Sequence, residues 1–330
     1  MPPSERRAPD SLTESGAFCV LLSALGPRPS ALGLQPATSA LMSIVYLNGD
    51  FLPRSEAKLS VDERGFFFGD GVYEVTRAVH GHIFEPDRHV RRLERGLREL
   101  RLDPRITMDA LLDVHLQLLR ENALEGGQAT IYLQITRGAA PRTHHFPPAG
   151  TPPTIFVSAT AFTPPNEARA RGVAAVTYPD YRWSRCDLKT VNLLPAVMAK
   201  QHAADNGAFE SIFVRGSALT EGSHTNAFGV IEGELRTYPN CNYILPGVTR
   251  DVVVEIAHEL GYRVSETPIF VHELARLEEF FVTGTTSDVM PVVTLDAKSV
   301  GKGTPGPITM TLYQALAARL AAVAAGSAAP

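Results

Sequence analysis

Residues 185–194 read RCDLKTVNLL, a short polar run that leads into the apolar start of a predicted helix. The run contains Lys189, one of only five lysines in a chain whose other 26 basic residues are arginines, 31 in all. Lysine differs from arginine because it can release its proton beside apolar groups and then attack a carbonyl carbon. A single lysine is usually an ordinary solvated residue, so its interpretation depends on the rest of the chain.

The composition indicates a globular chain and argues against several kinds of partner. Apolar residues make up 44% of the 330 residues, enough for a sizeable core in one large domain or two ordinary ones. The net charge of −4 argues against a nucleic-acid or acidic-membrane partner, and no apolar run approaches the roughly 20 residues that span a bilayer. The three cysteines are widely spaced, which predicts no disulfide framework and no metal site and fits a reducing, cytoplasmic compartment: Cys19, Cys186 and Cys241.

Changes in composition divide the chain into segments. The first part is rich in Pro, Ser, Ala and Leu, and Met42 opens a conventional start. A Pro-containing run near the middle is the best candidate for a linker. The predicted segments are a disordered extension (1–41), a small N-terminal α/β domain (42–163), an interdomain linker (164–170), a larger C-terminal domain (171–322) and a flexible tail (323–330).

The pattern of apolar residues predicts helices and strands on both sides of this linker. The pair Asn48-Gly49 between two apolar runs is a hairpin signal. Helical spacing predicts a helix over 86–100, and the sequence further predicts helices over 111–122, 194–205, 249–260 (closed by Gly261) and 309–322. Runs rich in β-branched residues predict strands over 71–79, 129–136, 154–158, 173–177 and 279–283, with several short strands between 211 and 236. We therefore expect a two-domain α/β or α+β enzyme with a cleft between the domains.

Polar groups recur at the ends of these predicted elements. Glu221 stands in a Gly/Ser/Asn turn between apolar strands. The segments 245–250 and 283–287 offer backbone N–H groups and hydroxyls at a helix start and after a strand, which suits an anion. Together with Lys189 they form the set that pyridoxal 5′-phosphate requires: a lysine for the aldehyde, a carboxylate for the pyridine nitrogen and a cradle for the phosphate. Each feature alone is more often an ordinary turn or helix cap.

Four segments resemble the fold-type IV (class IV) aminotransferases, in the order of that family. The resemblance covers about residues 45–291 and implies a small N-terminal and a larger C-terminal domain, the cofactor pyridoxal 5′-phosphate, amino acid and 2-oxo acid substrates, and a homodimer. The segments that carry it are DERGFFFGDGVYEV (62–75), RWSRCDLKTVNLL (182–194), TEGSHTNAFG (220–229) and LPGVTR (245–250).

The resemblance assigns a role to individual residues of this chain. Lys189 resembles the lysine that forms a Schiff base with the cofactor and shuttles the proton. Glu221 resembles the partner of the pyridine nitrogen, and Leu245 matches the apolar residue that packs on one face of the ring. The residues that resemble the phosphate ligands are Arg92, Val248, Thr249 and Thr285.

The loop TRGAAPRTHHFP (136–147) narrows the resemblance to the D-amino acid-specific members. In those members an arginine and a histidine two residues apart hold the substrate α-carboxylate together with a tyrosine, and Arg142, His144 and Tyr73 match them. An arginine fork and two neutral donors suit a carboxylate on chemical grounds as well. The alternatives are a branched-chain L-amino acid aminotransferase, an (R)-amine transaminase, an aminodeoxychorismate lyase and, from a different class, a non-catalytic α/β module.

Three positions depart from the pattern of the family. Phe66 stands where a tyrosine is common, and Gly284 replaces a hydroxyl residue in the phosphate turn. His224 stands where a small serine is usual. If His224 lies near the cofactor, it narrows the pocket or adds a hydrogen-bond donor, which affects the range of substrates.

Overall fold

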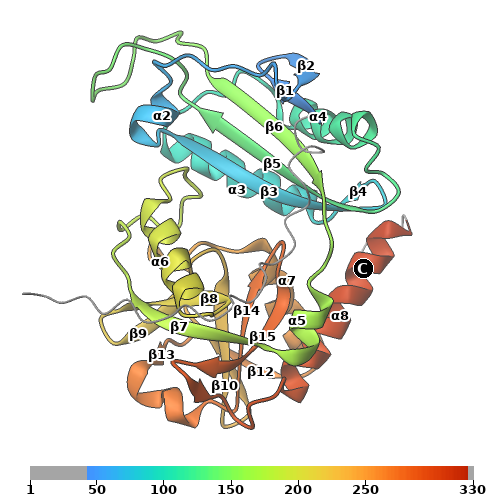
Figure 1. Ribbon diagram of the computed structural model, residues 1–330, viewed down its shortest axis with the longest axis vertical. Coiled ribbons are helices and arrows are strands. Elements are labelled where there is room, and N and C mark those ends of the chain that lie inside the picture. Colours follow the sequence, from blue (N-terminus) through green and yellow to red (C-terminus); the bar gives the residue numbers. More distant parts are fainter. Residues whose placement is uncertain (1–42, 326–330) are drawn as a thin grey trace, which may run out of the picture. The chain divides into compact units, whose positions relative to one another are not determined.

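The computed structural model describes residues 43–325, so the predicted extension 1–41 and residues 326–330 of the predicted tail lie outside the described residues. Two sheets with packed helices make up the described chain (Figure 1). The mixed α/β class predicted from the sequence is confirmed. No helix in the described residues is long and apolar enough to cross a membrane.

The first sheet contains six antiparallel strands in the order β2-β1-β6-β5-β3-β4. Its helices α3 and α4 cover one face, where Leu93 and Leu118 pack with alternate residues of β5 such as Ile131 and Leu133 (Figure 1). The bounds are β1 Ile44–Leu47, β2 Asp50–Pro53, α2 Arg64–Phe68, β3 Gly71–Val79, β4 His82–Ile83, α3 Pro86–Glu99, α4 Met108–Glu121, β5 Gln128–Thr136 and β6 Thr154–Ala161.

The predicted hairpin at Asn48-Gly49 is confirmed between β1 and β2. Both residues have positive φ, 53° for Asn48 and 115° for Gly49, which is the conformation that a tight two-residue hairpin turn requires. The pair therefore fixes the register of these strands.

The second sheet follows the order β12-β11-β10-β14-β15-β7-β8-β9-β13, and β16 pairs with β15. A further pairing joins β9 to β10 through Glu221 and Asn226, so the strands from β10 round to β9 form a closed ring. The bounds are β7 Val173–Pro179, β8 Glu210–Arg215, β9 Ala218–Gly222, β10 Asn226–Ile231, β11 Glu234–Thr237, β12 Arg263–Ser265, β13 Ile269–Phe270, β14 Glu279–Gly284, β15 Asp288–Leu295 and β16 Lys298–Ser299.

All five predicted helices are confirmed, with ends that differ by up to three residues. Three of them are α3, α4 and α6 (Leu194–Asp205), and the others are α7 (Val248–Glu259) and α8 (Pro307–Ala324). α8 runs two residues past the predicted domain end at 322. The sequence patterns did not predict the long strand β15, whose continuous apolar run carries no alternation, or the short helices α2, α5 (Asn166–Arg171) and η1 (Val271–Arg276).

The segment predicted as a linker contains α5 rather than extended chain alone. Its Arg169 is almost fully buried and donates to Asp288 at 3.0 Å and to the carbonyl of Val289 at 3.2 Å. The interval between β6 and β7 is therefore anchored to β15 of the second sheet.

Candidate active site

The loop that carries Lys189 pairs with the edge of β3 through a single antiparallel bridge between Thr190 and Val72. The amide of Tyr73 donates to the carbonyl of Lys189 at 3.0 Å, and the amide of Val191 donates to the carbonyl of Gly71 at 3.1 Å. The strand β4 pairs only with the far end of β3, so this stretch of β3 has an edge free for the loop. These backbone bonds fix Lys189 beside Tyr73.

The side chains of Lys189 and Tyr73 face each other across this pairing. The ammonium nitrogen lies 4.2 Å from the centre of the Tyr73 ring. Tyr73 is on the face of the sheet opposite α3 and α4, because its neighbour Val72 belongs to the helix-covered core and side chains alternate along a strand. Both residues open into one cavity, which Glu221, Leu245 and the turn 222–226 line from the second sheet.

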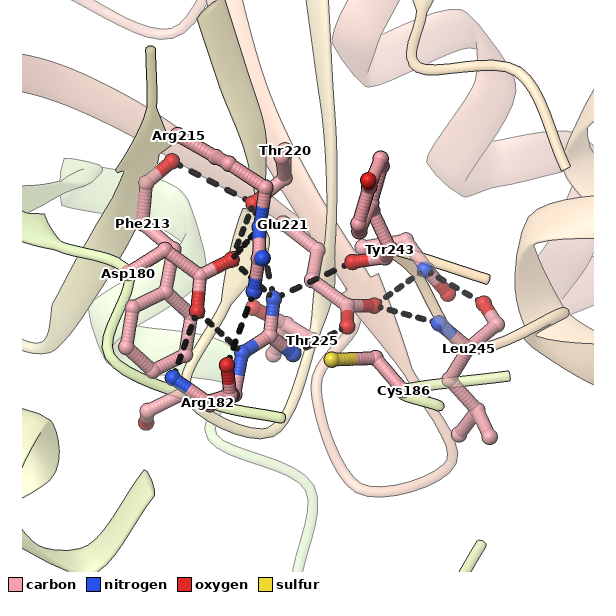
Figure 2. Close-up of polar contacts among 12 residues, drawn as sticks. Asp180, Arg182, Cys186, Phe213, Arg215, Thr220, Glu221, Thr225, Tyr243 and Leu245 are labelled. Atoms are coloured by element: carbon pink, nitrogen blue, oxygen red, sulfur yellow. Dashed lines mark hydrogen bonds and ion pairs between the residues drawn. The ribbon is translucent and has the colours of Figure 1, made fainter. Parts of the chain in front are cut away.

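Glu221 is a buried carboxylate held from three sides (Figure 2). Its Oε2 accepts a hydrogen bond from the amide of Leu245 and another from the side chain of Asn226, both at 3.0 Å. Its Oε1 accepts from the guanidinium of Arg182. Burial raises the pKa of Glu221 to about 7, and the charge of Arg182 limits the rise. The carboxyl group of Glu221 can therefore exchange a proton with a ligand near neutral pH.

Arg182 connects Glu221 to a second carboxylate, as Figure 2 shows. Its Nε and Nη2 donate to Asp180 at 2.9 and 3.0 Å, and Arg215 also donates to Asp180 at 3.0 Å. The guanidinium lies over the ring of Phe213, 4.1 Å from its centre. Because Arg182 is fixed in this way, it keeps its charge directed at Glu221. The sequence patterns assigned no role to Asp180 or Arg182, although Arg182 lies in a segment that carried the resemblance.

Arg92, the predicted phosphate arginine, extends from α3 toward the start of α7. It forms a paired contact with the buried Glu74 at 2.7 and 2.8 Å and donates to the carbonyl of Pro246 at 2.9 Å. Burial alone would raise the pKa of Glu74, but Arg92 and His89 outweigh it and hold that pKa well below its usual value. Pro246 lies two residues before Val248, the first residue of α7, so Arg92 is held close to the start of that helix.

The other predicted phosphate residues lie near this helix start but do not line the Lys189 cavity. Val248 and Thr249 are buried, and no side chain caps the N-terminus of α7. Thr249 and Thr285 line a smaller cavity together with His89, which bonds to Glu74 at 2.9 Å. The structure thus groups these residues with the Arg92 corner.

Arg142 and His144, the residues predicted to bind the substrate with Tyr73, lie neither at the cavity nor at the Arg92 corner. Both are exposed and lie beside Phe68: the Arg142 guanidinium is 5.3 Å and the His144 ring 5.6 Å from the centre of that ring. Neither lines the cavity of Lys189 in this chain.

The chain matches the family model described as amino-transferase class IV over residues 71–295. It belongs to the class IV aminotransferases. D-alanine aminotransferase from Staphylococcus haemolyticus is 39% identical over 273 residues, which cover 83% of this chain and 96% of that protein. D-alanine aminotransferase from Bacillus licheniformis is 37% identical over 272 residues, which cover 82% and 95%.

Solved structures of this family have the same fold. The branched-chain amino acid aminotransferase of Escherichia coli gives a TM-score of 0.78 at 26% identity, with 84% of this chain and 94% of that chain covered. The branched-chain amino acid aminotransferase of T.th., solved with pyridoxamine 5′-phosphate, gives 0.78 at 27% identity and the same coverage. The fold is thus the two-domain fold of type IV, as predicted.

Proposed function

We propose that this chain is a D-amino acid transaminase that moves an amino group between a D-amino acid of the D-alanine or D-glutamate type and a 2-oxo acid such as pyruvate or 2-oxoglutarate. The cofactor is pyridoxal 5′-phosphate. The single observation that carries the proposal is the cavity that joins Lys189, Tyr73 and the buried Glu221. The identity to D-alanine aminotransferases, 39% against 26–27% for the branched-chain structures, supports the D-specific assignment.

The residues around the cavity fit this cofactor. Lys189 is a primary amine at a cavity wall, and Glu221 is a buried carboxylate at the opposite sheet. The hydroxyl of Thr283, fully buried at the end of β14, has no hydrogen-bond partner within residues 43–325, and α7 begins without a side-chain cap. A phosphate near α7 would supply the acceptors that these groups lack. Arg92, Val248, Thr249 and Thr285 would hold it.

Bound pyridoxal 5′-phosphate supplies an electron sink through its protonated ring. Lys189 would hold the cofactor through its amine, and the amine, once free, would accept the proton from the substrate α-carbon and donate it to another carbon. The ring of Tyr73, 4.2 Å from Nζ, limits the positions that this amine can occupy. Leu245, which lines the cavity, would offer an apolar surface to the cofactor ring.

Glu221 holds the proton of the ring nitrogen. Burial raises the pKa of Glu221 to about 7 and so disfavours its ionised form. A protonated ring nitrogen beside it would favour that form again. Arg182 and Asp180 keep Glu221 in position, because the guanidinium bonds to both carboxylates. The roles proposed for these side chains rest on this network of contacts.

The substrate α-carboxylate is held by Tyr73, Arg142 and His144, and we propose that a second copy of the chain contributes the loop. Arg142 and His144 are exposed and lie away from the cavity of their own chain. Beside the cavity, α6 exposes an apolar face at helical spacing, Leu194, Val197 and Met198, with side chains 67%, 58% and 55% exposed. Apolar surface of this kind, beside the polar rim of a pocket, favours a homodimer interface.

A comparison of substrates tests the proposed function. The purified protein with pyridoxal 5′-phosphate should transaminate D-alanine and D-glutamate with 2-oxoglutarate or pyruvate, and L-leucine and L-valine much more slowly. Faster turnover of L-leucine would favour the branched-chain alternative, which the TM-scores of the branched-chain structures support. Turnover of an amine without a carboxylate, or pyruvate release without an acceptor, would favour the amine transaminase or the lyase.

The location we propose is the cytoplasm. The described cysteines, Cys186 and Cys241, are free thiols, and Cys186 is buried. Free thiols are typical of reducing compartments. Retention of activity in a reducing buffer, with no gain from oxidation, is the expected result.

A further inference from the structure

A second buried carboxylate lies beside the cavity and has no part in the mechanism described above. Glu210, the first residue of β8, is fully buried. It accepts hydrogen bonds from the amides of Ser211 and Ser223 at 2.9 and 3.2 Å and from the hydroxyl of Thr225 at 2.9 Å. A Cβ at Gly222 would lie 2.9 Å from the Glu210 carboxyl carbon, so only glycine lets the turn 222–226 close over this group.

The carboxylate of Glu210 is ionised and already faces one cation. Burial alone would raise the pKa of Glu210, but His224 and Lys200, with the hydrogen bond from Ser223, lower the pKa to about 2. Lys200 donates to the carbonyl of Phe209, next to Glu210, and so holds its charge in place. Lys200 and His224 are therefore the two side chains whose positive charge favours the ionised form of Glu210.

His224 lies between Glu210 and the cavity of Lys189. Its Nδ1 is 2.9 Å from Oε2 of Glu210 and 3.2 Å from the hydroxyl oxygen of Ser223, which itself donates to Glu210. Both neighbours can only accept a hydrogen bond from the ring, so Nδ1 carries a proton. The side chain is 41% exposed and lines the cavity, and within residues 43–325 its Nε2 has no hydrogen-bond partner. Nε2 of His224 is therefore available to bind a ligand in the cavity.

The other cations at the cavity are engaged elsewhere. Lys189 serves the cofactor, and Arg182 is held by Asp180 and Glu221. With His224 as a cation, the group formed by Glu210, Lys200 and His224 has a net charge of +1. A second carboxylate in the ligand would bring that charge back to zero and accept the Nε2 hydrogen bond.

We infer that His224, fixed by Glu210, is a specificity-determining residue that binds the side-chain carboxylate of dicarboxylic substrates, the class of D-glutamate, D-aspartate and 2-oxoglutarate. This inference rests on the proposed function and refines its choice of substrate. It predicts a preference for D-glutamate over D-alanine that His224 creates.

The test is His224→Ser in the holoenzyme, assayed with D-glutamate and with D-alanine at saturating pyruvate. kcat/KM for D-glutamate should fall about ten- to a hundredfold, the usual loss for one charge-assisted hydrogen bond, through KM rather than kcat. The D-alanine value should change less than about twofold, since the mechanism does not use this charge. His258→Ser, an exposed histidine at the end of α7, is the matched control and should alter neither value.

A second variant and a binding measurement protect the test from a failure to fold or react. His224→Gln can still donate to Glu210 but cannot take the second charge, so it should lose the D-glutamate preference as well. Trp183, the only tryptophan, lines the cavity, so its fluorescence should report glutarate binding, which both variants should weaken while binding of butyrate is unchanged.

The outcomes separate the inference from the proposed function. Equal losses for both substrates, or an unchanged D-glutamate preference in both variants, would overturn the role of His224 and leave D-amino acid transamination standing. If the wild type transaminates no D-amino acid, the proposed function fails, and the glutarate titration still decides whether His224 binds a second carboxylate.

Discussion

The cofactor side and the substrate side of the cavity are built in different ways. On the cofactor side, Glu221 receives bonds from Arg182, Asn226 and the Leu245 amide, all within one chain. Arg142 and His144, the residues proposed for the substrate, lie beside Phe68, are exposed, and do not line this cavity. If Arg142 and His144 bind the substrate as proposed, a single chain lacks them at its own cavity, and a second copy would have to supply them.

The largest effect is expected from Lys189→Ala. Loss of the amine removes both the group that holds the aldehyde and the proton carrier, so transamination should fall to the background rate. The next lysine along the chain, Lys200, is engaged with Phe209 and Glu210 and cannot replace it. Lys58→Ala, on an exposed residue, is the control. Normal transamination by the Lys189 variant would disprove the cofactor assignment.

Glu221→Gln should cost about a hundredfold in turnover while the cofactor still binds. The amide cannot hold the pyridine proton, and the loss of a positioned acid–base group typically has this size. The measurement pairs kcat with the dissociation constant of pyridoxal 5′-phosphate. An unchanged rate would mean that Glu221 only shapes its turn.

Arg142→Met should lower kcat/KM for D-alanine or D-glutamate by about ten- to a hundredfold, because a charge-assisted bond to the α-carboxylate is lost. Cofactor binding should be unchanged, and amines without a carboxylate should be affected far less. Arg91→Met, an exposed arginine on α3, is the matched control. If L-leucine is the better substrate and the variant leaves it unaffected, the D-specific assignment fails.

Mixed variants test directly whether two copies share the site. When Lys189→Ala and Arg142→Met chains are unfolded together and reassembled, a heterodimer contains one site with Lys189 from one chain and Arg142 from the other. Random pairing restores about a quarter of the sites. If Arg142 acts within its own chain, no site is restored, and activity per chain is half that of the Arg142→Met homodimer because half of the chains lack Lys189.

The sequence predicted those parts of the molecule that depend on local chemistry. The Asn48-Gly49 turn follows from backbone conformation, and α3 follows from the helical spacing of His89, Leu93 and Leu97. β15 could not be recognised, because a buried strand lacks alternation.

The contacts of the candidate site depend on pairing between distant strands. Nothing in the sequence indicates that Glu210 faces His224, 14 positions away, or that Asp180 holds Arg182 against Glu221. For the same reason a single chain's sequence does not reveal that Arg142 lies away from the cavity. The domain boundary predicted at residues 164–170 stays a proposal, which limited proteolysis would test.

The smallest expected effect is a pH dependence of stability. It should come from Glu221 on the cofactor side and not from Arg142. In the cofactor-free protein, burial raises the pKa of Glu221 to about 7 from 4.5, so the folded chain binds more protons than the unfolded chain between these values. The free energy of unfolding should therefore decrease as pH rises from about 4.5 to about 7, by on the order of 1–3 kcal/mol from this group.

Urea unfolding of the cofactor-free wild type and Glu221→Gln at pH 5 and pH 7.5 measures this contribution as a difference. Burial also lowers the pKa of His115 to about 4, so this residue makes the free energy of unfolding rise with pH. The contribution of His115 is the same in both proteins and cancels when their values are subtracted. Arg142→Met should follow the wild type, since the exposed loop carries no buried charge. If the free energy of unfolding of Glu221→Gln and of the wild type has the same pH dependence, ionisation of Glu221 does not destabilise the fold. Burial of Glu221 would then not favour a cationic ring beside it.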